Sequence, residues 1–364
     1  MRILQVASHL EIGGIPRHVV TLAQGLARRG HAVAVASGGG VLAAELRAAR
    51  VAHRQVPLHV KSELHPALAV AVARLLGIVR RERIDLLHAH TRVAQVAATF
   101  VSRLTSVPYV ATCHGFYRQR LGRRLWPCWG RRTIAISDAV RRWLEASGAS
   151  SARIAMVLNG IDVAPECWTV STQEQQRYRQ ELRLGSEPVI GIVGRVAAVK
   201  GHRWLLEAFG ALASDDVAAQ LLIVGGGPER ATLEREVAAR PWASRVRWTT
   251  AADVRLPLSM MDVVVVPSLW EEPFGLVAVE AMAAGRPVVA SRAGGLPEIV
   301  VDGETGLLAA RGDMPGLASA LRRLLADAAL RRRLGEAGRQ RAVERFSSER
   351  MAVDTEAVYR TVLR

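Results

Sequence analysis

The sequence has few cysteines, almost no lysine and no long uninterrupted apolar run. Its three cysteines, Cys113, Cys128 and Cys167, form no C-x-x-C pair, which argues against a disulfide framework and against a structural zinc site. No stretch approaches the ~20 consecutive apolar residues that a membrane-spanning helix needs. The opening segment MRILQVASHL is too short in apolar residues for a signal peptide and indicates a first β-strand. We therefore expect a protein of a reducing, cytoplasmic compartment.

Lysine is scarce although the chain is strongly basic. Of the 49 basic residues only two, Lys61 and Lys200, are lysines, and the formal net charge is +16. Arginine in place of lysine, alongside abundant alanine, glycine and valine, is typical of a GC-rich coding bias. The chain has neither an aromatic–basic RNA signature nor a basic recognition helix, so we expect no nucleic-acid partner. The excess charge fits a weak attraction to an anionic membrane surface or to phosphorylated substrates.

Short β-branched runs alternate with amphipathic helical patterns along the whole chain. At 364 residues the chain is too long for one ordinary core, so two domains are expected. Apolar strands separated by helices indicate an α/β fold, here two Rossmann-like domains with parallel sheets. The predicted strands are Ile3–Ala7, Ala32–Ser37, His53–Pro57, Asp85–His90, Tyr109–Cys113, Thr133–Ile136, Ile154–Leu158, Val189–Arg195, Gln220–Val224, Val246–Trp248, Val263–Pro267, Pro287–Ser291 and Gly306–Ala309.

A polar stretch at residues 171–188 interrupts this alternation. We therefore assign residues 1–170 to an N-terminal domain and residues 171–346 to a C-terminal domain. Residues 347–364 have a helical pattern with no strand after them, which predicts a helix that packs back toward the N-terminal domain.

Open parallel sheets bind ligands at the carboxyl ends of their strands. Gly13 and Gly14 follow the first strand and precede a helix opened by Pro16, and glycine there lets the backbone approach a ligand closely. The pattern is equally typical of a plain turn, and it is not the G-x-G-x-x-G of nicotinamide cofactors. His114 directly follows another strand, where a histidine is structural about as often as it is catalytic.

Arg195 and Lys200 follow the first strand of the C-terminal domain and precede a helix. Together they can offer a fork of donors and a point charge to a diphosphate at that helix N-terminus. The alternative is two basic residues on a solvated loop. The glycine loop at Gly225, after the next strand, either lines a nucleotide or only turns the chain.

Glu272 and Glu280 flank an otherwise almost wholly apolar stretch. Burying a carboxylate is costly unless it is paired or hydrogen-bonded. The sequence EEPFG predicts a helix beginning near Phe274–Gly275, so the N–H groups of Phe274, Gly275 and Leu276 face an anionic or hydroxyl-rich ligand. Glu272 can then accept from sugar hydroxyls and Glu280 from a vicinal diol such as ribose. The alternative for Glu280 is a pair with an arginine of the core.

These motifs together resemble the retaining glycosyltransferases of family 4, which have the GT-B architecture of two Rossmann-like domains that face each other across a cleft. The resemblance covers nearly the whole chain. It rests on the Gly13–Gly14 loop, HG at His114, NGID at 159–162, GR…KG at Arg195 and Lys200, GGGPE at 225–229, the E-x7-E pair Glu272 and Glu280, and AGRPVVAS, GGLPEIV and DGETGLL through residue 308. The strand RVRWTTAAD departs from the F-L-G-x-V common there.

The resemblance implies a hexosyltransferase that uses a nucleotide-diphosphate sugar, with the nucleotide sugar bound by the C-terminal domain (171–346) and the acceptor on the side of the N-terminal domain (1–170). It implies that Arg195 and Lys200 bind the diphosphate, that Glu280 binds the ribose and that Glu272 binds the donor sugar. His114 would contact the transferred hexose, and the glycine loop at 13–14 would close on the phosphates. No metal or other cofactor is expected, because the basic pair and the helix dipole neutralise the leaving diphosphate. His18, on the first helix, has no implied role.

The resemblance also suggests a glycan or lipid-linked acceptor, in cell-envelope glycan, lipopolysaccharide or glycolipid synthesis. Residues 114–132 interleave aromatic rings with arginine, a composition typical of an interfacial element. We therefore expect peripheral binding at the inner face of the membrane; a solvated loop beside two core tryptophans is the alternative. The segment contains Phe116, Tyr117, Trp126 and Trp129, with arginines 118, 120, 123, 124, 131 and 132.

Other functions remain open at this stage. A sugar-nucleotide epimerase could use the same fold without an acceptor. A phosphorylase would need a lysine for pyridoxal phosphate, and Lys200 is better used on the diphosphate. A polyanion-binding protein without catalysis would explain the charge, and its binding would fall with salt.

Overall fold

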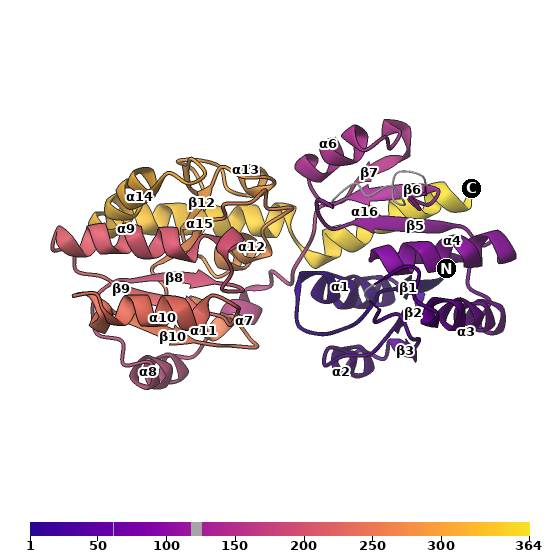
Figure 1. Ribbon diagram of the computed structural model, residues 1–364, viewed down its shortest axis with the longest axis horizontal. Coiled ribbons are helices and arrows are strands. Elements are labelled where there is room, and N and C mark those ends of the chain that lie inside the picture. The colour runs from indigo at the N-terminus through magenta and orange to yellow at the C-terminus, as the bar shows by residue number, and fades with distance from the viewer. Residues whose placement is uncertain (61, 118–125) are drawn as a thin grey trace. The chain divides into compact units, whose positions relative to one another are not determined.

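The computed structural model describes residues 1–60, 62–117 and 126–364. Two parts of the chain lie outside these residues. One is Lys61, and the other is 118–125, which includes arginines 118, 120, 123 and 124 of the predicted interfacial segment. The chain divides into two compact units: unit 1 is residues 1–162 with 346–364, and unit 2 is residues 163–345. Each unit is built on one parallel sheet covered by helices (Figure 1), which confirms the predicted fold class.

Unit 1 contains a seven-stranded sheet in the order β3-β2-β1-β4-β5-β6-β7. The chain passes from β1 outward through β2 to β3 and then returns to β4, so the topological switch point lies between β1 and β4. The strands are β1 (Arg2–Val6), β2 (Ala32–Ser37), β3 (Ala52–Gln55), β4 (Leu86–Ala89), β5 (Tyr109–Cys113), β6 (Arg132–Ala135) and β7 (Ile154–Met156). The helices are α1 (Gly14–Arg28), α2 (Ala43–Ala48), α3 (Ala67–Glu82), α4 (Arg92–Thr105), α6 (Asp138–Ala146) and α16 (Ser348–Leu363).

The two faces of this sheet are covered by different helices. Leu4 and Val6 of β1 belong to the core that includes α3 and α4. Ile3, which directly precedes Leu4, belongs to the core that includes Leu22 of α1 and Tyr359 of α16. Because successive side chains of a strand point to opposite faces, β1 supplies both cores.

The C-terminal helix α16 belongs to unit 1 although it follows unit 2 in sequence. Ser347 caps it, its hydroxyl accepting from the Arg350 N–H. Gly25 permits a close approach of α1, since a Cβ there would lie 2.9 Å from the Cβ of Ala352. Glu356 of α16 accepts hydrogen bonds from Arg360 and from Arg29, the C-cap residue of α1. These bonds lower the pKa of Glu356 to about 2, and the bond from Arg360 has the largest effect. Packing and charge both hold α16 on unit 1.

Unit 2 contains a six-stranded sheet in the order β10-β9-β8-β11-β12-β13. Its switch point lies between β8 and β11, where the chain crosses the sheet. The strands are β8 (Val189–Val193), β9 (Gln220–Val224), β10 (Val246–Thr249), β11 (Val263–Val266), β12 (Val288–Ser291) and β13 (Gly306–Ala309). The helices are α7 (Pro165–Trp168), α8 (Thr172–Glu181), α9 (His202–Ser214), α10 (Arg230–Ala238), α11 (Arg255–Met260), α12 (Leu276–Ala283), α13 (Leu296–Ile299), α14 (Met314–Ala326) and α15 (Ala328–Arg345).

The start of unit 2 differs in detail from the predicted organisation. The polar stretch at 171–188 contains α8, which a capping box of Ser171 and Glu174 begins. No residue of α8 is buried, so the sequence carries no apolar periodicity for this helix. The units divide between Asp162 and Val163, and residues 163–170, which the sequence placed in the first domain, lie in unit 2 together with α7.

The predicted strands are all present, with ends that differ by at most two residues. Their register is parallel throughout, as the continuous apolar runs indicated. Over the ranges that the structure covers, no helix is both long and apolar enough to span a bilayer.

Candidate active site

The predicted donor-binding residues of unit 2 meet at one edge of its sheet. Arg195 and Lys200 follow β8, Gly225 follows β9, and Glu272 follows β11. These three strands are neighbours in the sheet, and all end at its carboxyl edge because the sheet is parallel. The site therefore lies at the switch point, where open α/β sheets bind ligands.

The loops after β8 and β9 are bonded to each other. Gly194 N–H donates to the Val224 carbonyl at 2.9 Å, and Val196 N–H donates to the Gly226 carbonyl at 2.9 Å. Gly225 has φ 151°, and a Cβ there would lie 1.9 Å from the Gly194 carbonyl oxygen. Glycine at position 225 is thus required for loop packing, whether or not the loop also contacts a ligand.

The loop after β8 is equally fixed against the loop after β11. Gly201, the N-cap of α9, has φ 75°, and a Cβ there would lie 1.9 Å from the Pro267 carbonyl oxygen. The Leu269 N–H donates to the Val199 carbonyl at 2.9 Å. These contacts place Lys200 directly beside the segment that carries Glu272.

Lys200 and Glu272 form an ion pair in this arrangement. The Lys200 ammonium donates to both carboxylate oxygens of Glu272, at 3.0 and 2.7 Å. The Ser268 hydroxyl donates to the same carboxylate at 2.8 Å. Sequence reasoning assigned Lys200 and Glu272 to different parts of the donor and missed their contact. Adjacency of β8 and β11 in the sheet is the signal that would have revealed it.

The backbone of Glu272 is held by the loop after β12. The Gly295 N–H donates to the Glu272 carbonyl at 2.7 Å. Gly294 has φ 57°, and a Cβ there would lie 2.1 Å from that carbonyl oxygen. Glu271 is turned outward instead, accepting from the Gly294 N–H and pairing with Arg311 at 2.6 Å. Of the two adjacent glutamates, only Glu272 faces Lys200.

Two helix N-termini adjoin this ion pair. Helix α9 begins after Lys200, and helix α12 begins at Leu276 rather than at Phe274–Gly275, with Gly275 as its N-cap at φ 112°. Neither has a side-chain cap. The first-turn N–H groups of both helices are therefore suited to an anionic ligand. Glu280 lies on α12 and is half-buried, whereas Arg195 is exposed and makes no ion pair with any residue of the described ranges.

The predicted glycine loop of unit 1 is exposed to solvent and loosely packed. Gly13 and Gly14 are exposed, and α1 begins at Gly14. A Cβ on Gly13 would meet only the Pro16 ring, at 3.7 Å. Unlike Gly225, Gly13 has no packing reason to be glycine, which fits a close approach to a ligand.

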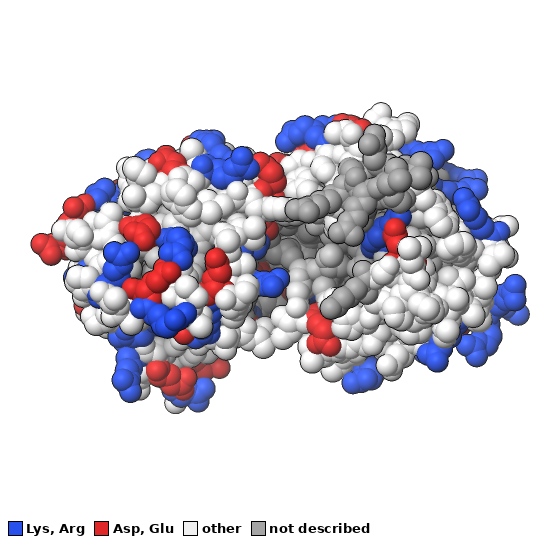
Figure 2. Space-filling view, in the orientation of Figure 1, with Lys and Arg blue, Asp and Glu red and all other residues white. Residues whose placement is uncertain are grey.

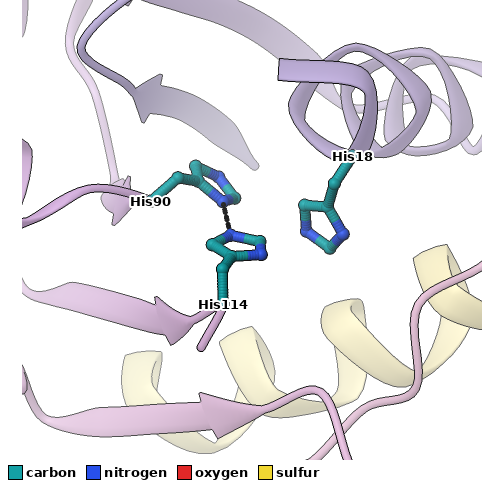
Figure 3. Close-up of side chains that lie close together, drawn as sticks. All are labelled: His18, His90 and His114. Carbon is teal, nitrogen blue, oxygen red and sulfur yellow. Dashed lines mark hydrogen bonds between the residues drawn. The ribbon is translucent and has the colours of Figure 1, made fainter. Parts of the chain in front are cut away.

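His114 belongs to a group of histidines at the switch point of the first sheet (Figure 3). His90 follows β4, His114 follows β5, and His18 points toward both rings from α1. His90 Nδ1 and His114 Nε2 are hydrogen-bonded at 3.2 Å. Burial holds the pKa of His90 and His114 well below the usual value and lowers that of His18 to about 4. All three rings are therefore neutral at pH 7.

His88 of β4 completes this group from within the sheet. Its ring lies on that of His90, with centroids 4.0 Å apart. Both of its nitrogens are bonded, to the Tyr359 hydroxyl at 2.6 Å and to the Thr112 hydroxyl at 2.7 Å. His88 is thus a structural link between the sheet and α16, and sequence reasoning singled out neither it nor His90.

Three of the four aromatic rings of the predicted interfacial segment pack on the protein. Phe116 and Tyr117 each meet the Trp143 ring edge-on, with centroids 6.4 and 6.0 Å apart. Trp126 packs edge-on to Phe100 and against the core of α3 and α4. These contacts favour the alternative of tryptophan beside the core.

Many arginines of unit 2 are paired with carboxylates. Arg203 pairs with Glu236 on α10, and Arg230 pairs with Glu234 at 2.7 Å. On the face drawn in Figure 2, acidic and basic side chains of this unit are interspersed. Unit 2 therefore presents no single-sign surface on that face, which argues against a polyanion-binding role for this unit.

A family model described as "Glycosyl transferases group 1" matches residues 174–341, and one described as "Glycosyltransferase Family 4" matches residues 12–165. An alpha-maltose-1-phosphate synthase of Mycolicibacterium smegmatis is 31% identical over 336 residues, covering 81% of this chain and 84% of that protein. An N-acetyl-alpha-D-glucosaminyl L-malate synthase of Bacillus anthracis is 27% identical over 382 residues, covering 99% of this chain and 97% of that protein. An Anabaena protein solved with UDP and glucose superposes with a TM-score of 0.86 at 23% identity, covering 99% of this chain and 100% of that one.

Proposed function

Because this chain belongs to the glycosyl transferases of group 1, in glycosyltransferase family 4, we propose that it transfers a sugar from a nucleoside-diphosphate donor to a hydroxyl acceptor with retention of configuration. The observation that carries the proposal is the convergence of Arg195, Lys200 and Glu272 at the carboxyl edge of the second sheet, beside two uncapped helix N-termini. This arrangement provides positive charge for a diphosphate and a carboxylate for sugar hydroxyls.

The cationic part of the site stabilises the leaving group. The Lys200 ammonium has three N–H donors, of which two bond Glu272, so one remains for a phosphate oxygen. The exposed Arg195 guanidinium offers a two-pronged contact. Negative charge grows on the diphosphate as the bond to the sugar breaks, and donors fixed beforehand stabilise that charge most.

The bond changes of the transfer balance without an external base. The acceptor oxygen forms a bond to the anomeric carbon on the face from which the diphosphate departs, while the carbon–oxygen bond to the diphosphate breaks. The leaving phosphate oxygen takes up the electron pair and then the proton of the acceptor hydroxyl. Glu272 accepts hydrogen bonds from the donor sugar, Glu280 binds the ribose diol, and His114 binds a substrate hydroxyl.

The names of similar proteins support the donor class. The Anabaena structure contains UDP and glucose, and the relatives are named as synthases of a maltose phosphate and of a glucosaminyl malate. Those products differ in their acceptors. A glycan or lipid-linked acceptor of the cell envelope, met at an anionic membrane surface, is the finer part of our proposal; the exposed Arg131 is the residue of the described segment best suited to such a surface.

A donor screen tests the proposal. Nucleotide sugars are ranked by thermal shift, because a ligand at ~100 times its dissociation constant adds roughly 2.7 kcal/mol of apparent stability. The best donor is then incubated with acceptor alcohols, and NMR is used to read the anomeric configuration of the product. We expect a retained anomer that forms only with acceptor present. Conversion of the donor to an epimer without acceptor would indicate the epimerase instead.

We also propose that transfer needs no metal ion, since Arg195 and Lys200 already supply the positive charge. Addition of EDTA, followed by dialysis, is expected to leave kcat within about twofold of the untreated value. Readdition of Mg²⁺ or Mn²⁺ serves as the control. A loss of activity with EDTA that Mg²⁺ or Mn²⁺ restores would contradict the proposal.

A further inference from the structure

One buried amide determines where the protons of the histidine group lie. Gln5 of β1 is fully buried, and only one orientation of its side-chain amide satisfies its neighbours. In that orientation its oxygen accepts from the Ala23 N–H of α1 at 3.1 Å. Its NH₂ donates to the Val19 carbonyl at 3.3 Å and to His90 Nε2 at 3.1 Å.

The orientation of Gln5 fixes the tautomer of His90. A neutral imidazole has one N–H and one acceptor nitrogen, and the bond made by one nitrogen sets the state of the other. Because His90 Nε2 accepts from Gln5, its proton lies on Nδ1. That N–H points at His114 Nε2, 3.2 Å away, which must then be the acceptor. The proton of His114 is therefore on Nδ1.

The remaining nitrogen of His114, Nδ1, is left for a further hydrogen bond. His114 is partly exposed, and no described residue bonds its Nδ1. His18 faces it from α1, with ring centroids 4.6 Å apart (Figure 3). Asn159 interacts with the buried His18 ring, but neither His18 nitrogen nor Asn159 Oδ1 has a partner of good hydrogen-bond geometry among the described residues. Buried polar atoms without a partner are rare, so a ligand hydroxyl beside His18 and His114 accounts for both.

We propose that Gln5 and His90 are positioning residues, which hold His114 as the Nδ1–H tautomer so that it donates a hydrogen bond to a substrate hydroxyl. The inference rests on the proposed function for the identity of the substrate as a sugar. The relay itself is a property of the folded chain. A hydroxyl suits the position because it can accept from His114 and also bond His18.

The same tautomer argues against a metal ion at His18, His90 and His114. These residues can each offer one nitrogen within 4.8 Å of the others, as the ligands of a metal site would. A metal needs the lone pair of the nitrogen that it binds, however, and the nitrogen of His90 that faces His114 carries its proton. The relay and a three-histidine metal site therefore exclude each other.

Nitrogen-15 NMR of the full-length protein at pH 7.5 tests the relay without substrate. We expect His114 of the wild type to show the shifts of an Nδ1–H tautomer. Gln5→Met keeps the length of the side chain but removes the donor, so His114 should lose this tautomer preference. His90→Asn keeps an N–H near His114 and should retain it. A wild-type His114 with its proton on Nε2, or an unchanged tautomer in Gln5→Met, would overturn the proposal.

Transfer kinetics give a second readout. We expect kcat to fall about 10-fold in Gln5→Met and His90→Ala, the effect of losing one oriented hydrogen bond, with partial recovery in His90→Asn. Tyr359→Phe is the matched control, because it removes a bond to His88 in the same buried group and leaves the relay intact. If Tyr359→Phe changes the His114 tautomer as much as Gln5→Met does, the tautomer depends on packing of the buried group in general and not on the bonds of Gln5 and His90.

Titration with Zn²⁺ distinguishes the relay from a metal site formed by His18, His90 and His114. We expect no zinc-dependent shift of the three ring signals at equimolar metal. Micromolar or tighter binding that His18→Ala abolishes would overturn the relay. If the tautomers agree with the proposal but no sugar transfer is found with any donor, only the proposed function fails.

Discussion

Replacing Lys200 or Arg195 with alanine is expected to lower kcat for sugar transfer by ~30- to 1,000-fold, equivalent to ~2–4 kcal/mol of barrier. Each change removes positive charge from the leaving diphosphate. Arg195→Ala is the cleaner test, because the side chain is exposed and pairs with no carboxylate of the described ranges, so folding should be unaffected. Steady-state kinetics with the best donor, together with thermal unfolding of each variant, would measure both effects.

Arg240 provides the matched control for lost arginine charge. It lies on the surface of unit 2, where it pairs with Glu207 at 3.4 Å and both side chains are about half exposed. Exposed ion pairs of this kind contribute little to folding stability, so the Arg240→Ala variant should transfer sugar at the wild-type rate. If Lys200→Ala and Arg195→Ala also retain wild-type rates, neither residue binds the diphosphate.

The second large effect is expected at Glu272. Glu272→Gln keeps the size of the side chain and an oxygen that can accept from Ser268, but it removes the negative charge that holds Lys200. Hydrogen bonds to charged groups contribute ~1.5–3 kcal/mol, which corresponds to a ~10- to 150-fold loss of kcat/KM. We expect the donor KM to rise as well, since Glu272 also binds the donor sugar in our proposal.

A double-mutant cycle tests whether the Lys200–Glu272 contact persists during transfer. Because the two residues bond each other, the double variant Lys200→Ala/Glu272→Gln should lose less activity than the product of the single losses. The exposed pair Arg203–Glu236 is the control cycle, for which no coupling in kcat/KM is expected. Strictly multiplicative losses at Lys200 and Glu272 would show that the two residues act independently once the donor is bound.

The fold could be predicted from the sequence because its signal is local. Many of the buried parallel strands contain a short apolar run, such as Leu221–Val224 or Val263–Val266, and the run marks the strand wherever it lies in the sheet. Helix α8 was missed for the opposite reason. It buries no side chain, so neither periodicity nor an apolar face distinguishes it from a polar linker.

The partners of the site residues could not be predicted, because they depend on the order of strands. Lys200 and Glu272 are 72 positions apart and meet only because β11 lies beside β8. Gln5 and His90 likewise meet because β4 returns beside β1. Glycine at 225 and 201 was visible in the sequence, but its reason, a carbonyl oxygen 1.9 Å from where a Cβ would lie, exists only after the loops have packed.

The sequence by itself determined that this chain has two parallel-sheet units and that Arg195, Lys200, Glu272 and His114 follow strands. Strand ends carry ligands in such sheets, so spacing and chemistry alone marked these residues as candidates, and the resemblance to the family supplied the roles that we propose for them. Tertiary structure decided which of them touch. It paired Lys200 with Glu272 and gave His114 its bond from His90, because hydrogen bonds and ion pairs need distances near 3 Å, and only the packed sheet sets such distances between residues remote in the chain.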